Sequence, residues 1–275
     1  MMKSVKSQTL NLKLILRAIE SFFYKIRFNI ALYRTLHSRE HNSICNKIRE
    51  AIYKQILHIA TVEKINLILG ITKADKKEAE TRLEKYWIPL LAILDEEGFY
   101  QYIVSSANRG GQAGMDKLRV NETFKLKDKK LLDAFKVRVK EAAILIDQTT
   151  KQWLVDKVLL GEEKDLASID IAKYIRSFAR DYSLIRAELI AEEEAIRAFG
   201  GIEAEFYKRN KVDFHRWLTS RDELVCKDCV ANEEAGTIPV GELFPGGVVT
   251  TPQHYRCRCI LLPMPKEEVK IKWIG

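Results

Sequence analysis

The feature that most constrains this chain is a group of cysteines and one histidine near the C-terminus. Cys226 and Cys229 form a C-x2-C pair, and after a gap of 24 residues the chain reads HYRCRC over 254–259. The segment 221–265 also holds five of the six prolines and few large apolar residues. A segment this small and irregular commonly needs a disulfide or a metal to hold its fold.

The spacing of these residues is typical of a zinc site. Zn2+ takes four nitrogen or sulfur ligands in a tetrahedron, with bonds of about 2.0–2.3 Å. If 257–259 is extended, Cys257 and Cys259 point to the same face. Two ligand sets therefore remain open. One is Cys226, Cys229, Cys257 and Cys259; the other is Cys226, Cys229, His254 and one of the two later cysteines.

Other uses of these cysteines are less favoured. Four of the five cysteines fall within 34 residues, which indicates a local metal site and not a disulfide framework. A thioredoxin-like redox pair would start a helix in a βαβ unit, whereas this pair follows a loop-rich segment. A catalytic zinc would keep a position open beside a general base. Glu233, Glu234 and Glu242 lie nearby in sequence, but no pattern places them at the metal.

The rest of the chain predicts helix after helix. Apolar residues recur at helical spacing in several stripes, and a long helix is expected from about 127 to 160. Ser168 can cap the next helix, and the Gly200-Gly201 pair predicts the end of a third. The clearest stripes are Ile44, Ile48, Ile52 and Ile56, and then Leu83, Trp87, Leu90, Leu91 and Leu94.

Two segments depart from the helical pattern. Residues 105–123 contain Gly110, Gly111 and Gly114, which predict a flexible connector. Residues 213–220, DFHRWLTS, alternate like a strand. We therefore expect an α+β fold: a predominantly α-helical body with a small C-terminal zinc-stapled strand and loop unit. The expected domains are a basic helical region (1–104), a second helical part (105–212) and the zinc-knuckle unit (213–275).

The positive charge lies in the N-terminal quarter. The chain carries a net charge of +8, and residues 1–75 account for it with 13 basic and five acidic side chains. Such a segment favours an anionic neighbour, which is nucleic acid, an acidic protein or a membrane surface. No apolar run approaches the roughly 20 residues of a membrane helix, and no signal peptide is expected. The predicted contact residues are Lys13, Arg17, Lys25, Arg27 and Arg34.

The C-terminal segment resembles a known family. FHRWLTSRDELVCKDC, the turn GTIP and the closing TPQHYRCRC are similar to the signature of phage minor head proteins, the Mu F-like head-morphogenesis family. That family closes on His-Pro-Asn-Cys-Arg-Cys, so Tyr255 and Arg256 replace Pro-Asn here. The resemblance covers about 105–265. The matching positions are Trp217, Thr219, Asp222, Cys226, Cys229, Gly236, Pro239, His254, Cys257, Arg258, Cys259 and, upstream, Arg186 and Glu188.

The resemblance implies a structural component of a tailed-phage virion and no enzymatic activity. The expected partners are the portal protein, the major capsid or scaffold protein and, through the basic N-terminal region, genomic DNA. The expected location is the capsid interior at the portal vertex, and the host cytoplasm during assembly. Arg186, Glu188, Trp217 and Asp222 are expected to support the zinc unit; otherwise Arg186 and Glu188 are a solvated pair on different faces of a helix.

A nucleic-acid-binding zinc ribbon, or a nuclease-like protein, is the alternative. A His-metal nuclease would need a second histidine or asparagine around a hydrolytic metal. His215 and His254 are the only histidines after residue 210, and no paired acidic cluster accompanies them. The sequence therefore favours the structural role.

Overall fold

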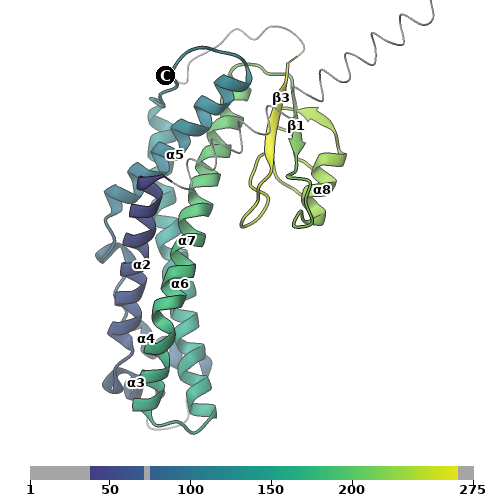
Figure 1. The fold of residues 1–275 in the computed structure, drawn as a ribbon. Coiled ribbons are helices and arrows are strands. Elements are labelled where there is room, and N and C mark those ends of the chain that lie inside the picture. Colours follow the sequence, from purple (N-terminus) through teal and green to yellow (C-terminus); the bar gives the residue numbers. More distant parts are fainter. Residues whose placement is uncertain (1–37, 71–74, 266–275) are drawn as a thin grey trace, which may run out of the picture. The chain divides into compact units, whose positions relative to one another are not determined.

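A computed structural model describes residues 38–70 and 75–265 (Figure 1). It is mostly helical, with one small antiparallel sheet near the C-terminus, which is compatible with the expected α+β class. No helix in these ranges is both long and apolar enough to cross a membrane. The elements are α2 (Arg39–Ile59), α3 (Val62–Leu69), α4 (Lys76–Glu84), η1 (Leu90–Ala92), α5 (Glu96–Lys117), α6 (Lys129–Glu163), α7 (Ser168–Arg209), β1 (Phe214–Leu218), α8 (Lys227–Glu234), β2 (Thr237–Pro239) and β3 (Ile260–Met264).

The chain divides into two compact units. The helical unit comprises 39–105 and 127–194, and the sheet unit comprises 106–126 and 195–265 together with Ser38. These units do not follow the predicted ranges 1–104, 105–212 and 213–275, because α5 and α7 each contribute residues to both.

The helical unit is built on aliphatic stripes. In α2, Ile48, Ile52 and Ile56 are fully buried, which confirms the predicted stripe. Helices α6 and α7 run side by side (Figure 1), and the rings of Trp153 and Tyr182 stack between them with centroids 4.2 Å apart. Long amphipathic helices of this kind can bury a continuous apolar surface without further support.

The predicted stripe from Leu83 to Leu94 does not form one helix. Helix α4 ends at Glu84, and after Pro89 the chain makes only the short η1. Proline cannot continue a helix that precedes it, because its ring excludes the helical conformation for the residue before. Asp147 of α6 fixes the break: its carboxylate accepts from the Leu90 backbone N–H at 3.1 Å and from the Trp87 indole at 3.1 Å.

The glycine-rich stretch 105–123 is not a connector, and that prediction is wrong. Helix α5 runs through all three glycines to Lys117. A Cβ on Gly110 would lie 2.0 Å from the carbonyl oxygen of Phe199, so glycine here permits close contact with α7. Helix α7 likewise continues through Gly200, where a Cβ would lie 2.2 Å from the Thr251 carbonyl oxygen. Close packing, and not flexibility, explains these glycines.

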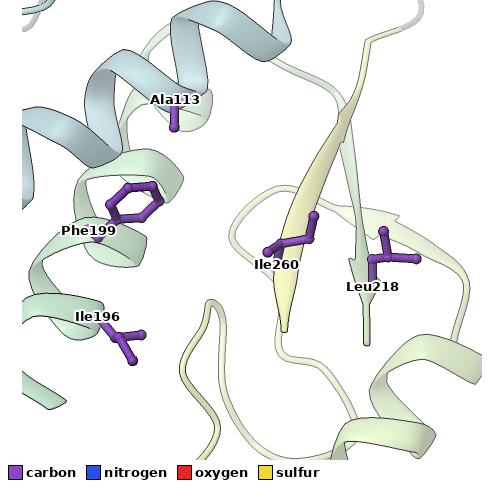
Figure 2. Close-up of a cluster of buried hydrophobic side chains, with 5 residues drawn as sticks. All are labelled: Ala113, Ile196, Phe199, Leu218 and Ile260. Carbon is purple, nitrogen blue, oxygen red and sulfur yellow. The ribbon is translucent and has the colours of Figure 1, made fainter. Parts of the chain in front are cut away.

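The sheet unit has three antiparallel strands in the order β2-β1-β3. The strand predicted within 213–220 is confirmed as β1, and it is the central strand. In its pairing with β3, Leu218 lies opposite Ile260. One face of the sheet buries Leu218 and Ile260 in a cluster with Ala113, Ile196 and Phe199 (Figure 2). The other face carries Trp217, which is fully buried and lies edge-on to Phe244 at 5.1 Å.

A buried ion pair also joins β3 to the helices of the sheet unit. The ammonium of Lys117 on α5 donates to Glu203 of α7 at 2.5 Å and to the Leu261 carbonyl of β3 at 2.7 Å. The Tyr207 hydroxyl donates to the same Glu203 oxygen at 2.7 Å. Both charged side chains are almost completely buried. Since buried charges must be paired, this network specifies how β3 lies against α5 and α7.

Candidate metal centre

The first half of the site is the turn that opens α8. Cys226 is the N-cap of this helix, and its sulfur accepts a hydrogen bond from the Cys229 backbone N–H at 3.3 Å. The C-x2-C pair thus does begin a helix, contrary to the sequence interpretation. The βαβ context of a redox pair does not follow, because β1 pairs antiparallel with both neighbours.

The second half is a turn from His254 to Cys257. The Cys257 backbone N–H donates to the His254 carbonyl at 3.1 Å, and Arg256 takes a left-handed φ of 57° within the turn. The His254 Nδ1 lies 2.7 Å from the Tyr255 carbonyl oxygen. A carbonyl can only accept, so Nδ1 carries the hydrogen and Nε2 presents its lone pair. Metal-binding histidines are commonly held in this way.

The two halves meet at Cys229. Its sulfur lies 3.4 Å from His254 Nε2 and 3.9 Å from the Cys257 sulfur. A tetrahedral zinc site has N···S edges of about 3.5 Å and S···S edges of about 3.8 Å, as its bond lengths require. Two groups of mutually close donor atoms share Cys229: one with Cys226 and His254, the other with Cys257 and Cys259. The cluster could hold a metal ion, and its donor chemistry fits zinc.

Burial and contacts among the cysteines shift the pKa values of the thiols. Cys229, Cys257 and Cys259 are all buried. Burial raises the pKa of Cys229, and the nearby Cys257 raises it further. The pKa of Cys257 falls to about 5, first because Cys259 hydrogen-bonds to it. The same hydrogen bond is the first cause of the raised pKa of Cys259.

An ion pair ties the loop before Cys226 to the second half-site. The two terminal guanidinium nitrogens of Arg258, Nη1 and Nη2, donate to the Asp222 carboxylate at 2.6 and 2.7 Å. The hydrogen bond from Arg258 is the first cause of the lowered pKa of Asp222. Arg258 stands between Cys257 and Cys259, so this bidentate contact fixes the segment before β3 that presents both sulfurs.

Helix α8 is fastened by its own polar side chains. Glu233 accepts from Arg221 at 2.8 Å and from the hydroxyl of Thr219 at the end of β1. Burial raises the pKa of Glu233, but the hydrogen bonds from Thr219 and Arg221 outweigh this effect and leave it lowered. Asn232, fully buried, donates to Gln253 at 3.2 Å, next to His254. Helix α8 is therefore bonded to the segment after β1 and to the loop that leads into His254.

Trp217 and His215 lie on the same face of β1, where both rings pack against Phe244. The His215 ring lies 5.0 Å from Phe244, and neither of its nitrogens has a hydrogen-bond partner among the described residues. Burial lowers the pKa of His215 to about 4. His215 belongs to neither group of candidate ligands in the described chain. This histidine is neutral at pH 7 and acts as an apolar packing group.

Of the remaining predicted residues, two belong to the helical unit and five lie outside the described residues. Arg186 and Glu188 belong to the helical unit, where Arg186 donates to the Thr149 hydroxyl at 2.9 Å. Glu188 is exposed, and its charge adds to burial in raising the pKa of Cys45 to about 11. The five N-terminal contact residues, Lys13, Arg17, Lys25, Arg27 and Arg34, lie outside the described residues.

The sequence interpretation named Arg258 and Asp222 but did not predict that they form an ion pair, because nothing in the HYRCRC motif indicates Asp222 as a partner. It also missed the roles of other residues that hold the site. Glu233 was considered only as a possible base; its position four residues after Cys229 on a helix was the available signal. Asn232 and Gln253 gave no signal, because their contact depends on the path of the loop 240–253.

We compared the chain with protein families, curated proteins and solved structures. No family model, no curated protein and no solved structure matches this chain.

Proposed function

We propose that the chain is a structural head-morphogenesis protein of a tailed bacteriophage, a minor capsid protein whose C-terminal sheet is held by Zn2+. One observation carries the proposal. The C-terminal residues that resemble the minor head family all belong to the sheet unit, where Asp222, Thr219 and Arg258 make the polar contacts around the cysteines. Contacts of this kind hold a fold together and point to a structural role.

The donor set supports a structural metal over a catalytic one. Five sulfur and nitrogen donors are available for four positions, and three of the sulfurs are buried. A catalytic zinc keeps one position open for water or substrate, whereas a structural zinc is closed by protein ligands. Thiolate and imidazole ligands also favour zinc over magnesium or calcium. The metal would therefore stabilise the sheet unit and take no part in a reaction.

The proposed partners follow from charge and from the resemblance. The basic excess of residues 1–75 suits the packaged genome or an acidic face of the portal protein. A protein of this kind would act at the portal vertex in the capsid interior, together with the portal and the major capsid or scaffold protein. Binding to phosphates would weaken steeply as salt rises, whereas binding to the portal through apolar contacts would not.

Particle composition tests this proposal. The tagged chain is produced in cells that carry its encoding genome, and purified procapsids and virions are analysed by mass spectrometry. We expect the wild-type chain in the particles, with a portal ring that co-purifies. The Cys226→Ser/Cys229→Ser variant should be lost from them, while the matched control Cys45→Ser, in the helical unit, should be retained. Particles that assemble normally without the chain would contradict the proposal.

A nuclease assay addresses the alternative directly. The purified full chain is mixed with plasmid and Mg2+ or Mn2+. We expect no cleavage. Cleavage that His254→Ala abolishes would replace the structural role with a catalytic one.

A further inference from the structure

The sequence leaves five candidate ligands for four positions, and the geometry distinguishes them. The two halves of the site have the same construction. Each is a tight turn with donors three residues apart, Cys226 with Cys229 and His254 with Cys257. Cys259 belongs to neither turn and directly precedes β3.

Cys229 relates the two turns to each other. Its sulfur stands at tetrahedral edge distances from both donors of the second turn, 3.4 Å to His254 Nε2 and 3.9 Å to the Cys257 sulfur. The hydrogen on His254 Nδ1 is engaged by the Tyr255 carbonyl, so Nε2 needs no rearrangement to bind a cation. A ligand set without His254 would leave this oriented lone pair beside the metal and unused.

The net charge of the metal site also favours a ligand set that includes His254. Four thiolates around Zn2+ carry a net charge of −2, whereas three thiolates and a neutral imidazole carry −1. Burying the larger charge costs more unless cations compensate it. Arg258 is a nearby cation between the two last cysteines, and Asp222 already pairs with both of its terminal guanidinium nitrogens.

We propose that Cys226, Cys229, His254 and Cys257 bind one tetrahedral Zn2+, and that Cys259 stays outside the coordination sphere and positions the Cys257 sulfur. This inference rests on the zinc site of the proposed function. Cys259 is 4% exposed, and its sulfur lies within 4.8 Å of the Cys257 sulfur, on the residue that leads into β3. It thus connects a ligand to the paired strand, where Ile260 faces Leu218. Side chains that lie next to a metal ligand in this way orient it and tune its affinity.

X-ray absorption at the zinc edge tests the ligand set without any substitution. The full chain, purified with Zn2+ at one equivalent, should show three sulfurs at about 2.3 Å and one nitrogen at about 2.0 Å. A shell of four sulfurs would overturn the ligand set while leaving the zinc site itself intact. A chain that binds no zinc would overturn the metal site of the proposed function as well.

Cobalt substitution then assigns each residue. In the full chain loaded with Co2+, Cys257→Ser should lower the thiolate-to-cobalt absorption by about a third, because one of three thiolates is lost. Cys259→Ser should leave the absorption per bound ion unchanged and weaken Zn2+ binding about 10- to 100-fold, as expected for a partner of a ligand. Cys45→Ser should change neither. Loss of thiolate-to-cobalt absorption in Cys259→Ser would overturn the assignment. An unchanged cobalt ligand-field spectrum in His254→Ala would overturn it as well.

Discussion

The two units of this protein bury their interiors by different means. The helical unit uses long helices, and its α2 stripe of Ile48, Ile52 and Ile56 is fully buried. The sheet unit has strands of three to five residues, and its contacts include a buried ion pair, several carboxylate contacts and a cluster of thiols. Short strands alone bury too little apolar surface to be stable. In the sheet unit, ion pairs, hydrogen bonds and the thiol cluster therefore supply stabilisation that buried apolar area supplies in the helical unit. The sheet unit should therefore fail when single bonds are removed, and the helical unit should not.

The largest expected effect is the loss of one ligand. Structural zinc sites contribute about 10–16 kcal/mol of apparent folding free energy, as much as the whole stability of a domain. Cys229→Ser should thus unfold the sheet unit and leave the helical unit folded. Limited proteolysis should cut within 213–265 first, while far-UV circular dichroism keeps most of its helical signal. Cys45→Ser is the matched control. A Cys229→Ser chain whose sheet unit resists the protease would contradict the claim that this unit depends on its metal ligands.

The buried ion pair should be the next most sensitive point. Lys117→Met leaves Glu203 buried without its cation, and breaking such a pair costs about 3–5 kcal/mol. Amide exchange in β1 and β3, followed against urea concentration, measures the loss. Adding Glu203→Gln to Lys117→Met should recover part of the stability, because it removes the uncompensated charge. Equal stability of the single variant and the wild type would show that this pair does not secure β3.

Acid should destabilise the sheet unit through His215. Its pKa is about 4 in the folded chain and about 6.5 when unfolded, so folding favours the neutral ring. This contribution is complete above pH 6.5 and is lost as the pH falls towards 4, by roughly 3 kcal/mol in all. His215→Phe should reduce that loss. The measurement is the difference in urea midpoint between the variant and the wild type at pH 7, 5 and 4; a constant difference would contradict the account.

The smallest effect is expected at Arg256. This exposed residue holds a φ of 57° in the turn between His254 and Cys257. Asparagine adopts the left-handed region more readily than arginine does, so Arg256→Asn should stabilise the sheet unit by less than about 1 kcal/mol. Thermal unfolding measures the gain, with Lys227→Asn at a right-handed helical position as the control. Destabilisation would mean that the Arg256 side chain makes a contact worth more than the strain.

Much of the helical architecture could be predicted from periodicity. The α2 stripe, the long helix α6 and the central strand β1 all follow from residue spacing. The glycines misled the prediction, because a glycine at a close helix contact and a glycine in a flexible loop look alike in sequence. Only the position of Phe199 against Gly110 distinguishes them, and that contact joins residues far apart in the chain.

The candidate site shows the same limit. The spacing of Cys226, Cys229 and the HYRCRC motif was sufficient to predict a cluster of possible metal ligands. It could not predict which donors face Cys229, because that depends on the fold of the loop 240–253. The contacts Asp222 with Arg258 and Thr219 with Glu233 join residues 14 to 36 positions apart, and local patterns carry no information on such pairs.

Hydrogen exchange of the full chain, with zinc bound and after chelation, tests the central claim most directly. The account predicts that chelation removes amide protection from β1, α8 and β3 together, while the buried stripe of α2 and the core of α6 keep theirs. Re-addition of one equivalent of Zn2+ should restore the protection. If β1 and β3 stayed protected without metal, or if both units lost protection equally, the metal would not be what holds the sheet unit.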